Sequence, residues 1–143
     1  MNWNYLLLSF DGRISRQPFW IGFALLLAAE IAAQSFAQRI EGDRLGAIVD
    51  LAFTYPEFAL FTKRANDRNT PIWLVGMFFA VGVTLNFLTM VGWNGSPDER
   101  TPLFMLMLTL WAVFALALLI DLGFRPGVAG RNQFGPNPLD RPQ

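Results

Sequence analysis

Four long apolar stretches alternate with short polar segments along the chain, and this pattern predicts an all-α membrane protein. The stretches cover residues 18–37, 46–62, 71–92 and 102–124. At about 1.5 Å of rise per residue, roughly 20 residues cross a hydrocarbon core about 30 Å thick. The first, third and fourth stretches reach that length, and 143 residues hold too little polar sequence to cover them in a soluble fold. We therefore predict a single domain over residues 1–143, built as a four-helix transmembrane bundle.

The second stretch, residues 46–62, is the weakest of the four. Only 11 of its 17 residues are apolar, and it contains Asp50, Pro56 and Glu57. One interpretation is a short re-entrant segment, and the other is a short, kinked spanning helix inside the bundle. We favour the kinked helix, because its polar groups then face protein rather than lipid.

The two ends of the chain flank these spans. Residues 1–10 mix Trp3, Leu6 and other apolar residues with polar positions, which predicts either an interfacial helix lying on the membrane or an apolar segment packed against the bundle. Nothing in this region has the pattern of a cleaved secretory signal. The tail over residues 125–143 is rich in Gly, Pro and Asn, which predicts turns.

Composition narrows the possible functions. The chain is 53% hydrophobic and 15% charged, with a formal net charge of zero and neither His nor Cys. Missing Cys excludes disulfides and thiol nucleophiles, and missing His removes the commonest general base and metal ligand. A net charge of zero argues against a nucleic-acid partner. We therefore predict a protein that is not an enzyme and has no cofactor or metal site.

Basic residues indicate the orientation. In the four-span arrangement, one side holds Arg13, Arg16, Lys63, Arg64, Arg68, Arg125, Arg131 and Arg141, whereas the other holds Arg39, Arg44 and Arg100. Eight against three places both termini in the cytoplasm. The split is again eight against three if residues 46–62 do not span, with the amino end moved outside. Arg13 and Arg16 precede the first span, whose flanking charges usually dominate, and this favours four spans.

Polar side chains within the apolar stretches form the first candidate site. They are Glu30, Gln34, Asp50, Glu57, Asn86 and Asp121. Glu30 and Gln34 lie one helical turn apart, and Asp50 and Glu57 share a face of the second helix. These two stripes either line a path for a proton or small solute, or hold helices together through hydrogen bonds. Asp121 lies near the end of its helix, close to Arg125, and is expected to reach the interface.

Basic and polar residues beside the membrane form the second candidate site. They are Arg13, Arg16, Lys63, Arg64, Asp67, Arg68, Arg131 and Asn132. The cluster either anchors the topology and stabilises the bundle, or binds an anionic lipid headgroup or another partner. Whether the chain forms a homo-oligomer stays open.

Small residues recur at every fourth position in two spans. Ala24, Ala28 and Ala32 line one side of the first, and Gly76, Ala80 and Thr84 do the same on the third. Such ridges allow close backbone approach, so we expect them to pack within the bundle.

Three segments resemble the domain of unknown function 805 family of small bacterial inner-membrane proteins. Phe10–Trp20 is similar to the family's Gly-Arg, Arg, Phe-Trp opening, and Gly130–Pro138 is close to its Asn, aromatic, Gly-Pro, Pro tail. Pro56–Trp73 looks like the family's Arg-Arg-Leu-His-Asp loop followed by Trp, except that Ala65 and Asn66 replace Leu and His. Asn66 keeps hydrogen bonding but does not titrate near neutral pH. The resemblance implies an inner-membrane location and a fold, but no activity.

Four spans bring these three segments to one face of the membrane. Arg13, Arg16, Arg64, Asp67, Arg131 and Asn132 are then expected to form one polar network under the bundle. Our first hypothesis is a non-enzymatic inner-membrane protein whose network stabilises the bundle or binds anionic lipid or a partner. The alternative is a small-solute or proton transporter or channel that uses the intramembrane carboxylates.

Overall fold

The computed structural model describes residues 2–40, 43–96 and 99–140, and in these residues the chain forms five helices and no strand. The helices are α1 (Trp3–Leu8), α2 (Arg16–Ile40), α3 (Asp43–Arg68), α4 (Ile72–Met90) and α5 (Pro102–Phe124). The last four are long and apolar enough to cross a membrane. The predicted all-α bundle of four candidate spans is confirmed.

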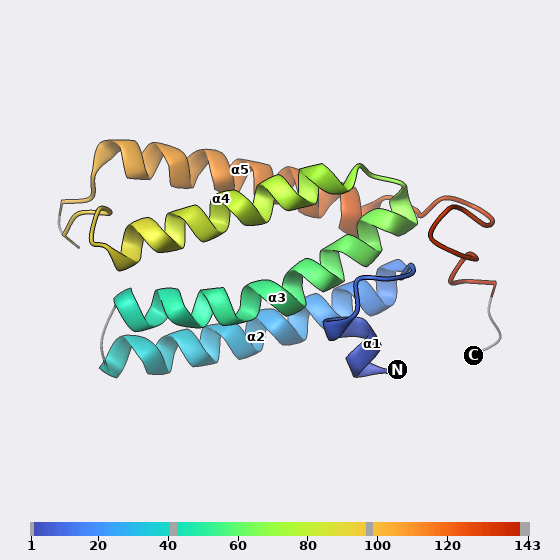
Figure 1. Cartoon of the computed structure of the whole chain (residues 1–143), viewed down its shortest axis with the longest axis horizontal. Helices are drawn as coiled ribbons and strands as arrows, with labels where there is room; N and C mark the ends of the chain where they lie inside the picture. The colour runs from blue at the N-terminus through green and yellow to red at the C-terminus, as the bar shows by residue number, and fades with distance from the viewer. Residues whose placement is uncertain (1, 41–42, 97–98, 141–143) are drawn as a thin grey trace.

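The four long helices run antiparallel to their neighbours, as two hairpins (Figure 1). α1, the α3–α4 turn and the tail after α5 lie together, and we call this side the termini end. The end of α2, the start of α3, the end of α4 and the start of α5 lie at the other side, which we call the loop end. α3 contacts every other helix, whereas α2 and α4 do not touch within the described residues. The bundle is therefore organised around α3.

α3 is much longer than predicted. The expected span covered residues 46–62, but the helix continues for 26 residues, from Asp43 to Arg68, with Pro56 inside it. It runs beside α2 and then crosses toward α4 in its second half (Figure 1). The prediction of a short helix was wrong because Lys63, Arg64 and Arg68 were interpreted as a loop. These cationic side chains lie instead on the last turns of α3, where Lys63 and Arg64 are fully buried.

α1 packs against the bundle through Leu6, with Tyr5 and Leu7 partly buried beside it, and leaves other residues exposed. Leu6 is 1% exposed and belongs to the hydrophobic core, while Trp3 and Leu8 are 43% and 56% exposed. α1 contacts both α2 and α3. The short amino-terminal helix therefore exists and is packed. Its position at a membrane interface stays a prediction.

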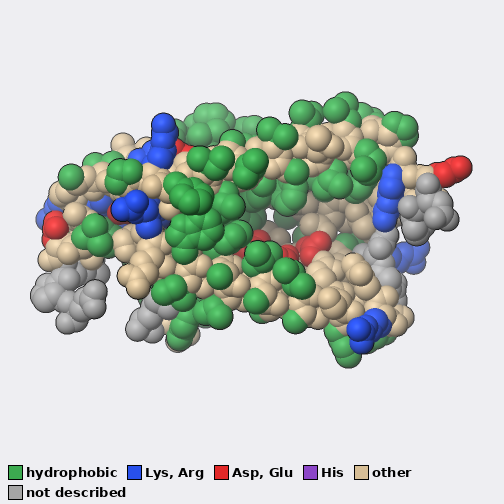
Figure 2. Space-filling view, turned by 180° about the vertical axis from the view of Figure 1, so that it is seen from behind, with side chains coloured by type: hydrophobic (Ala, Val, Ile, Leu, Met, Phe, Trp, Pro, Cys, Tyr) green, Lys and Arg blue, Asp and Glu red, His purple; other side chains and the backbone are tan. Residues whose placement is uncertain are grey.

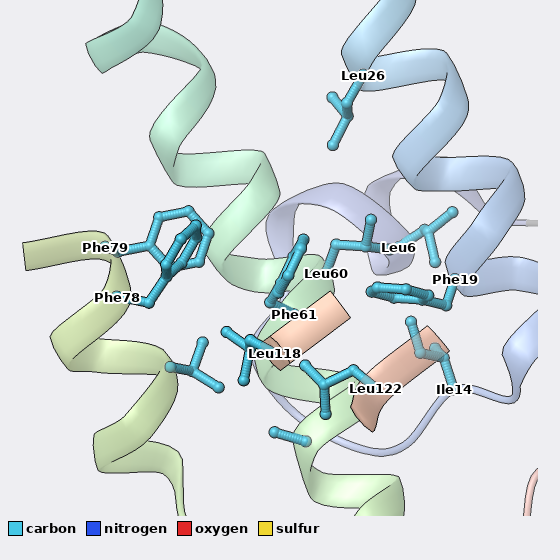
Figure 3. Packing of buried hydrophobic residues seen from close by; sticks show 12 residues of the cluster. Leu6, Ile14, Phe19, Leu26, Leu60, Phe61, Phe78, Phe79, Leu118 and Leu122 are labelled. Atoms are coloured by element: carbon cyan, nitrogen blue, oxygen red, sulfur yellow. The ribbon is translucent and has the colours of Figure 1, made fainter. Parts of the chain in front are cut away.

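The hydrophobic core lies toward the termini end of the bundle, with members from α1, α2, α3, α4 and α5. Figure 3 shows its packing from close by. Phe19 of α2, Phe61 of α3 and Phe79 of α4 form a chain of edge-to-face rings, with centroids 5.3 and 5.7 Å apart. Phe78 stacks on Trp111 of α5 at 5.0 Å. Such ring pairs add packing energy beyond area burial, so aromatic residues connect all four long helices here.

The two small-residue ridges do not pack inside the bundle as expected. Ala24, Ala28 and Ala32 are exposed, and so are Ala80 and Thr84. α2 instead turns Phe19, Gly22 and Leu26 toward the core. The contact of α2 with the core is therefore made by large side chains and one glycine, and the small residues of both ridges face outward.

Candidate functional site: a charged clasp and an acid-lined cleft

Asp67 is the centre of a buried charge network at the termini end. Its Oδ1 accepts a hydrogen bond from Arg13 Nε at 3.0 Å, and its Oδ2 accepts one from Arg64 Nη1. The side chains of all three residues are almost completely buried. Burying a charge is costly unless it is paired and hydrogen-bonded, and one carboxylate here serves two guanidinium groups.

Backbone carbonyls of the tail satisfy the remaining donors of Arg13. Its Nη1 donates to Gly130 O at 2.8 Å and Gly135 O at 3.2 Å, and its Nη2 donates to Val128 O at 2.6 Å. The amide of Val128 in turn donates to Asp67 O at 2.8 Å. The tail is therefore folded back under the bundle and held by a buried cation.

Arg64 joins α5 and the first loop to the same centre. Its Nε donates to Leu122 O and its Nη2 to Arg125 O, both at 2.6 Å. A third hydrogen bond runs from Nη1 to Ile14 O at 3.3 Å. Because a guanidinium offers five donors in a rigid fork, one side chain ties together three separate segments of the chain.

Three further side chains complete this region. Lys63 Nζ donates to Ser9 O and lies 5.4 Å from the ring centroid of Tyr5. Asn66 Nδ2 donates to Gly12 O at 3.1 Å, and Asn132 Nδ2 donates to Asn66 O at 2.9 Å. We call this network the clasp, and it consists of Arg13, Lys63, Arg64, Asn66, Asp67 and Asn132.

The other predicted members of the basic cluster lie outside the clasp. Arg16 is exposed and reaches Phe124 O at 3.3 Å, and Arg131 is exposed on the tail. Arg68 pairs with Asp121 at 3.0 Å. Arg141, which was counted in the orientation argument, lies outside the described residues.

Asp121 does not belong with the other intramembrane acids. It accepts from Arg68 Nη2, from Arg125 Nη1 at 2.9 Å and from Thr70 Oγ1 at 3.2 Å, all at the termini end. Asp121 lies inside the candidate span Pro102–Phe124, but its position one turn from the end of α5 brings it to these cations. The expected approach to Arg125 is observed.

A cavity of about 420 Å³ opens between the two hairpins, beyond the aromatic core. Glu30 of α2 and Asp50, Thr54 and Glu57 of α3 form its polar wall. Facing residues include Gly82 and Asn86 of α4 and Trp111 of α5. The size falls within the range of roughly 300–1,000 Å³ that is typical of small-molecule sites.

The carboxylates in this cavity lie close to one another. Glu30 of α2 and Glu57 of α3 line the same cavity. Asp50 accepts from Gln34 Nε2, which also donates to Gly46 O at 3.0 Å. Two facing carboxylates repel each other unless a proton or a cation lies between them. The polar wall is therefore suited to a positively charged guest.

A second cavity of about 440 Å³ continues from the first toward the loop end. Asp50 and Asn86 line both, and Gln34, Gln38 and Thr89 add further polar groups to the second. The space-filling view shows acidic side chains beside a hollow between the two hairpins (Figure 2). We call the two connected cavities the cleft.

Sequence reasoning grouped Glu30, Gln34, Asp50, Glu57 and Asn86, and the structure places all five on the cleft. Gln38, which continues the turn-by-turn stripe of Glu30 and Gln34, lines the outer part as that stripe predicts. Sequence reasoning missed Thr89 and Arg100, which line the outer part as well. Nothing local to Arg100 points to the cleft.

The four apolar helices, the clasp and the cleft define a multi-pass helical membrane protein with a cavity between its hairpins, one wall of which carries carboxylates. The family model described as "Protein of unknown function (DUF805)" matches residues 7–136, and the chain belongs to that family. The match confirms the resemblance drawn from the three motif segments.

Two curated relatives have the same coverage. The uncharacterized protein YiiR of Escherichia coli strain K12 is 29% identical over 138 residues, which are 94% of this chain and 88% of that protein. YiiR of Escherichia coli O157:H7 matches with the same values. No solved structure matches this chain at a comparable level of significance.

Proposed function

We propose that this protein is a carrier that binds a small organic cation in the cleft, inside the membrane. The observation that supports the proposal is the convergence of Glu30, Asp50 and Glu57 on one cavity. Carboxylates at membrane depth cost several kcal/mol (about 2.5–3.5 on insertion scales), so each needs a partner, a proton or water. The one described Lys or Arg that lines either part of the cleft is Arg100, at the loop end.

The walls of the cleft favour an organic cation over a simple metal ion. Phe61 of α3, Phe78 and Phe79 of α4, and Trp111 of α5 line it together with the acids. Aromatic faces attract ammonium groups by about 0.5–2 kcal/mol, and they also bury the apolar part of such a ligand. Aromatic faces with carboxylates are a known arrangement for recognising substituted ammonium ions.

The direction of entry follows from the charges and the packing. The excess of basic residues at the termini end supports a cytoplasmic position for both termini in a bacterial inner membrane. The loop end then faces outward. Phe61, Phe78 and Phe79 belong to both the cleft lining and the core, so the cleft ends against packed rings on the inner side. The proposal is therefore an outward-open carrier, with the clasp holding its inner end closed.

The test is a titration of the purified protein with tetramethylammonium, followed by tryptophan fluorescence. Trp111 lines the cleft and stacks on Phe78, so a bound cation changes its emission. We expect saturable binding that tert-butanol, an uncharged molecule of similar shape, does not reproduce. Glu57→Gln is expected to weaken binding about tenfold or more, since charge-assisted contacts are worth roughly 1.5–3 kcal/mol.

Glu99→Gln is the matched control, because Glu99 is an exposed glutamate outside the cleft. It should bind tetramethylammonium as the unmodified protein does. Equal binding of tetramethylammonium and tert-butanol, or unchanged binding by Glu57→Gln, would contradict the proposal.

A further inference from the structure

A separate small cavity lies at the termini end, outside the clasp. It encloses about 180 Å³ between the start of α2, the end of α3 and the tail. Ser15, just before α2, and Arg16, its first residue, line the cavity, with Arg64 and Asp67 of α3 and Gly127 and Asn137 of the tail. Neither part of the cleft shares any of these residues.

The electrostatics of this cavity favour an anion. The described residues of the termini end include seven Lys or Arg side chains and four Asp side chains, a surplus of three positive charges. The negative group in the lining, Asp67, already accepts from both Arg13 and Arg64. Two guanidinium groups therefore share one carboxylate beside the cavity, and the uncompensated charge is positive.

Arg16 is the cation in this cavity that has capacity for an outside ligand. Arg13 uses all five of its donors, and Arg64 four of its five, on Asp67 and backbone carbonyls, and both side chains are buried within the clasp. Arg16 is exposed, and its hydrogen bond to a described residue is a single contact of Nη1 with Phe124 O at 3.3 Å. Its other donors match the oxygen geometry of a phosphate group.

The surroundings of Arg16 join this charge to an apolar surface. Phe124, whose carbonyl Arg16 contacts, is 64% exposed, and Leu139 of the cavity lining is 75% exposed. The Phe124 ring lies 5.3 Å from that of Trp20. Tryptophan and basic residues at the end of a span mark the headgroup level of a bilayer. An anionic head beside an apolar chain matches this surface.

We propose that this cavity binds the phosphate of an anionic phospholipid, with Arg16 as the principal donor and Phe124 beside the acyl chain. The site is independent of the cleft and does not rest on the carrier proposal. The sequence predicts that the whole basic cluster either stabilises the bundle or binds anionic lipid. In this proposal the clasp cations stabilise the bundle, and Arg16 binds the lipid.

The test is lipid retention by protein taken from vesicles of phosphatidylcholine with one fifth phosphatidylglycerol, measured by native mass spectrometry. The unmodified protein is expected to retain phosphatidylglycerol preferentially. Arg16→Gln is expected to lose this preference by about tenfold, the effect of removing one charge-assisted contact. Arg131→Gln is the matched control, because Arg131 is an exposed arginine of the same end that does not line the cavity.

Three outcomes would overturn the proposal. The first is equal retention of the two lipids by the unmodified protein. The second is an equal loss in Arg16→Gln and Arg131→Gln, which would mean diffuse attraction to the membrane. The third is displacement of the lipid by millimolar inorganic phosphate, which would make the cavity a site for a free anion. Unchanged melting of Arg16→Gln in pure phosphatidylcholine shows that the variant is folded.

Discussion

The clasp and the cleft both contain buried charges, and they compensate those charges in opposite ways. In the clasp, Arg13 and Arg64 meet Asp67 and a set of backbone carbonyls at 2.6–3.3 Å, so their donors are used within the chain. In the cleft, Glu30 and Glu57 face each other beside a cavity of about 420 Å³. The difference teaches that burial of a charge does not by itself distinguish a structural site from a ligand-binding site. The two kinds of site are distinguished by whether the buried charges have partners within the chain.

The largest expected effect comes from breaking the clasp at its centre. Asp67→Asn removes the one carboxylate that two buried guanidinium groups share, and we expect a loss of about 3–5 kcal/mol of unfolding free energy. Equilibrium unfolding in detergent measures it. Asp140→Asn, at an exposed tail position, is the control and should be close to neutral. Equal stability of the two variants would show that the clasp is not the element that holds the bundle.

A steric variant tests the same element without changing any charge. A Cβ at Gly127 would collide with the Asp67 carboxylate, whereas one at Gly76 meets nothing within 4 Å. We expect Gly127→Ala to cost about 1–3 kcal/mol, because the tail must move away from Asp67. Gly76→Ala should leave the unfolding free energy unchanged or slightly raised. If the two substitutions have the same effect, the tail is not held against Asp67.

Each region contains one tryptophan whose indole N–H donates a single hydrogen bond, so the same substitution can be compared in both regions. Trp20 Nε1 donates to Gly123 O near the clasp, and Trp111 Nε1 donates to Phe78 O beside the cleft, both at 3.0 Å. Replacing either by Phe should cost about 0.5–1.5 kcal/mol. Only Trp111→Phe should also remove the fluorescence response to tetramethylammonium. Loss of that response in Trp20→Phe instead would place the cation elsewhere.

The smallest expected effect on stability is in the cleft. Glu30→Gln removes a charge that has no described cationic partner, so the unfolding free energy should change by less than about 1 kcal/mol or rise. The same detergent unfolding measurement applies. A loss comparable to that of Asp67→Asn would mean that the cleft acids join helices, as the alternative interpretation of the sequence holds.

The sequence predicted the structure best where the pattern of apolar and polar residues follows the surroundings of the helix. The predicted fourth span, residues 102–124, matches α5 (Pro102–Phe124), because Pro102 and Arg125 bound a long, predominantly apolar segment. The polar stripes of α2 and α3 were recognisable from helical spacing alone. Both predictions depend on residues that either lie on the apolar surface of a span or share one face of a helix. At such positions the residue type reflects whether the surroundings are apolar or polar.

The clasp shows why the rest was not predictable. Hydropathy treats Lys63 and Arg64 as solvent-exposed, yet both are completely buried and continue α3 past the predicted end. Their partners are carbonyls of Ser9, Leu122 and Arg125, and a backbone carbonyl leaves no mark in a sequence. Arg131 was grouped with Arg13 for the same reason, although the structure leaves it exposed. Charge counts identified the correct end of the molecule but not the correct partners.

The most direct test of the central contrast uses the absence of cysteine from this chain, which leaves no background thiol. Asn86→Cys introduces one thiol where both parts of the cleft meet. We predict that a membrane-impermeant, cationic thiol reagent added from the loop end labels it, and that tetramethylammonium slows the labelling. Cysteine at Ala65, within the clasp end, or at lipid-facing Leu110 should stay unlabelled. If Asn86→Cys resists labelling from the loop end as the two controls do, the cleft is closed and the account is wrong.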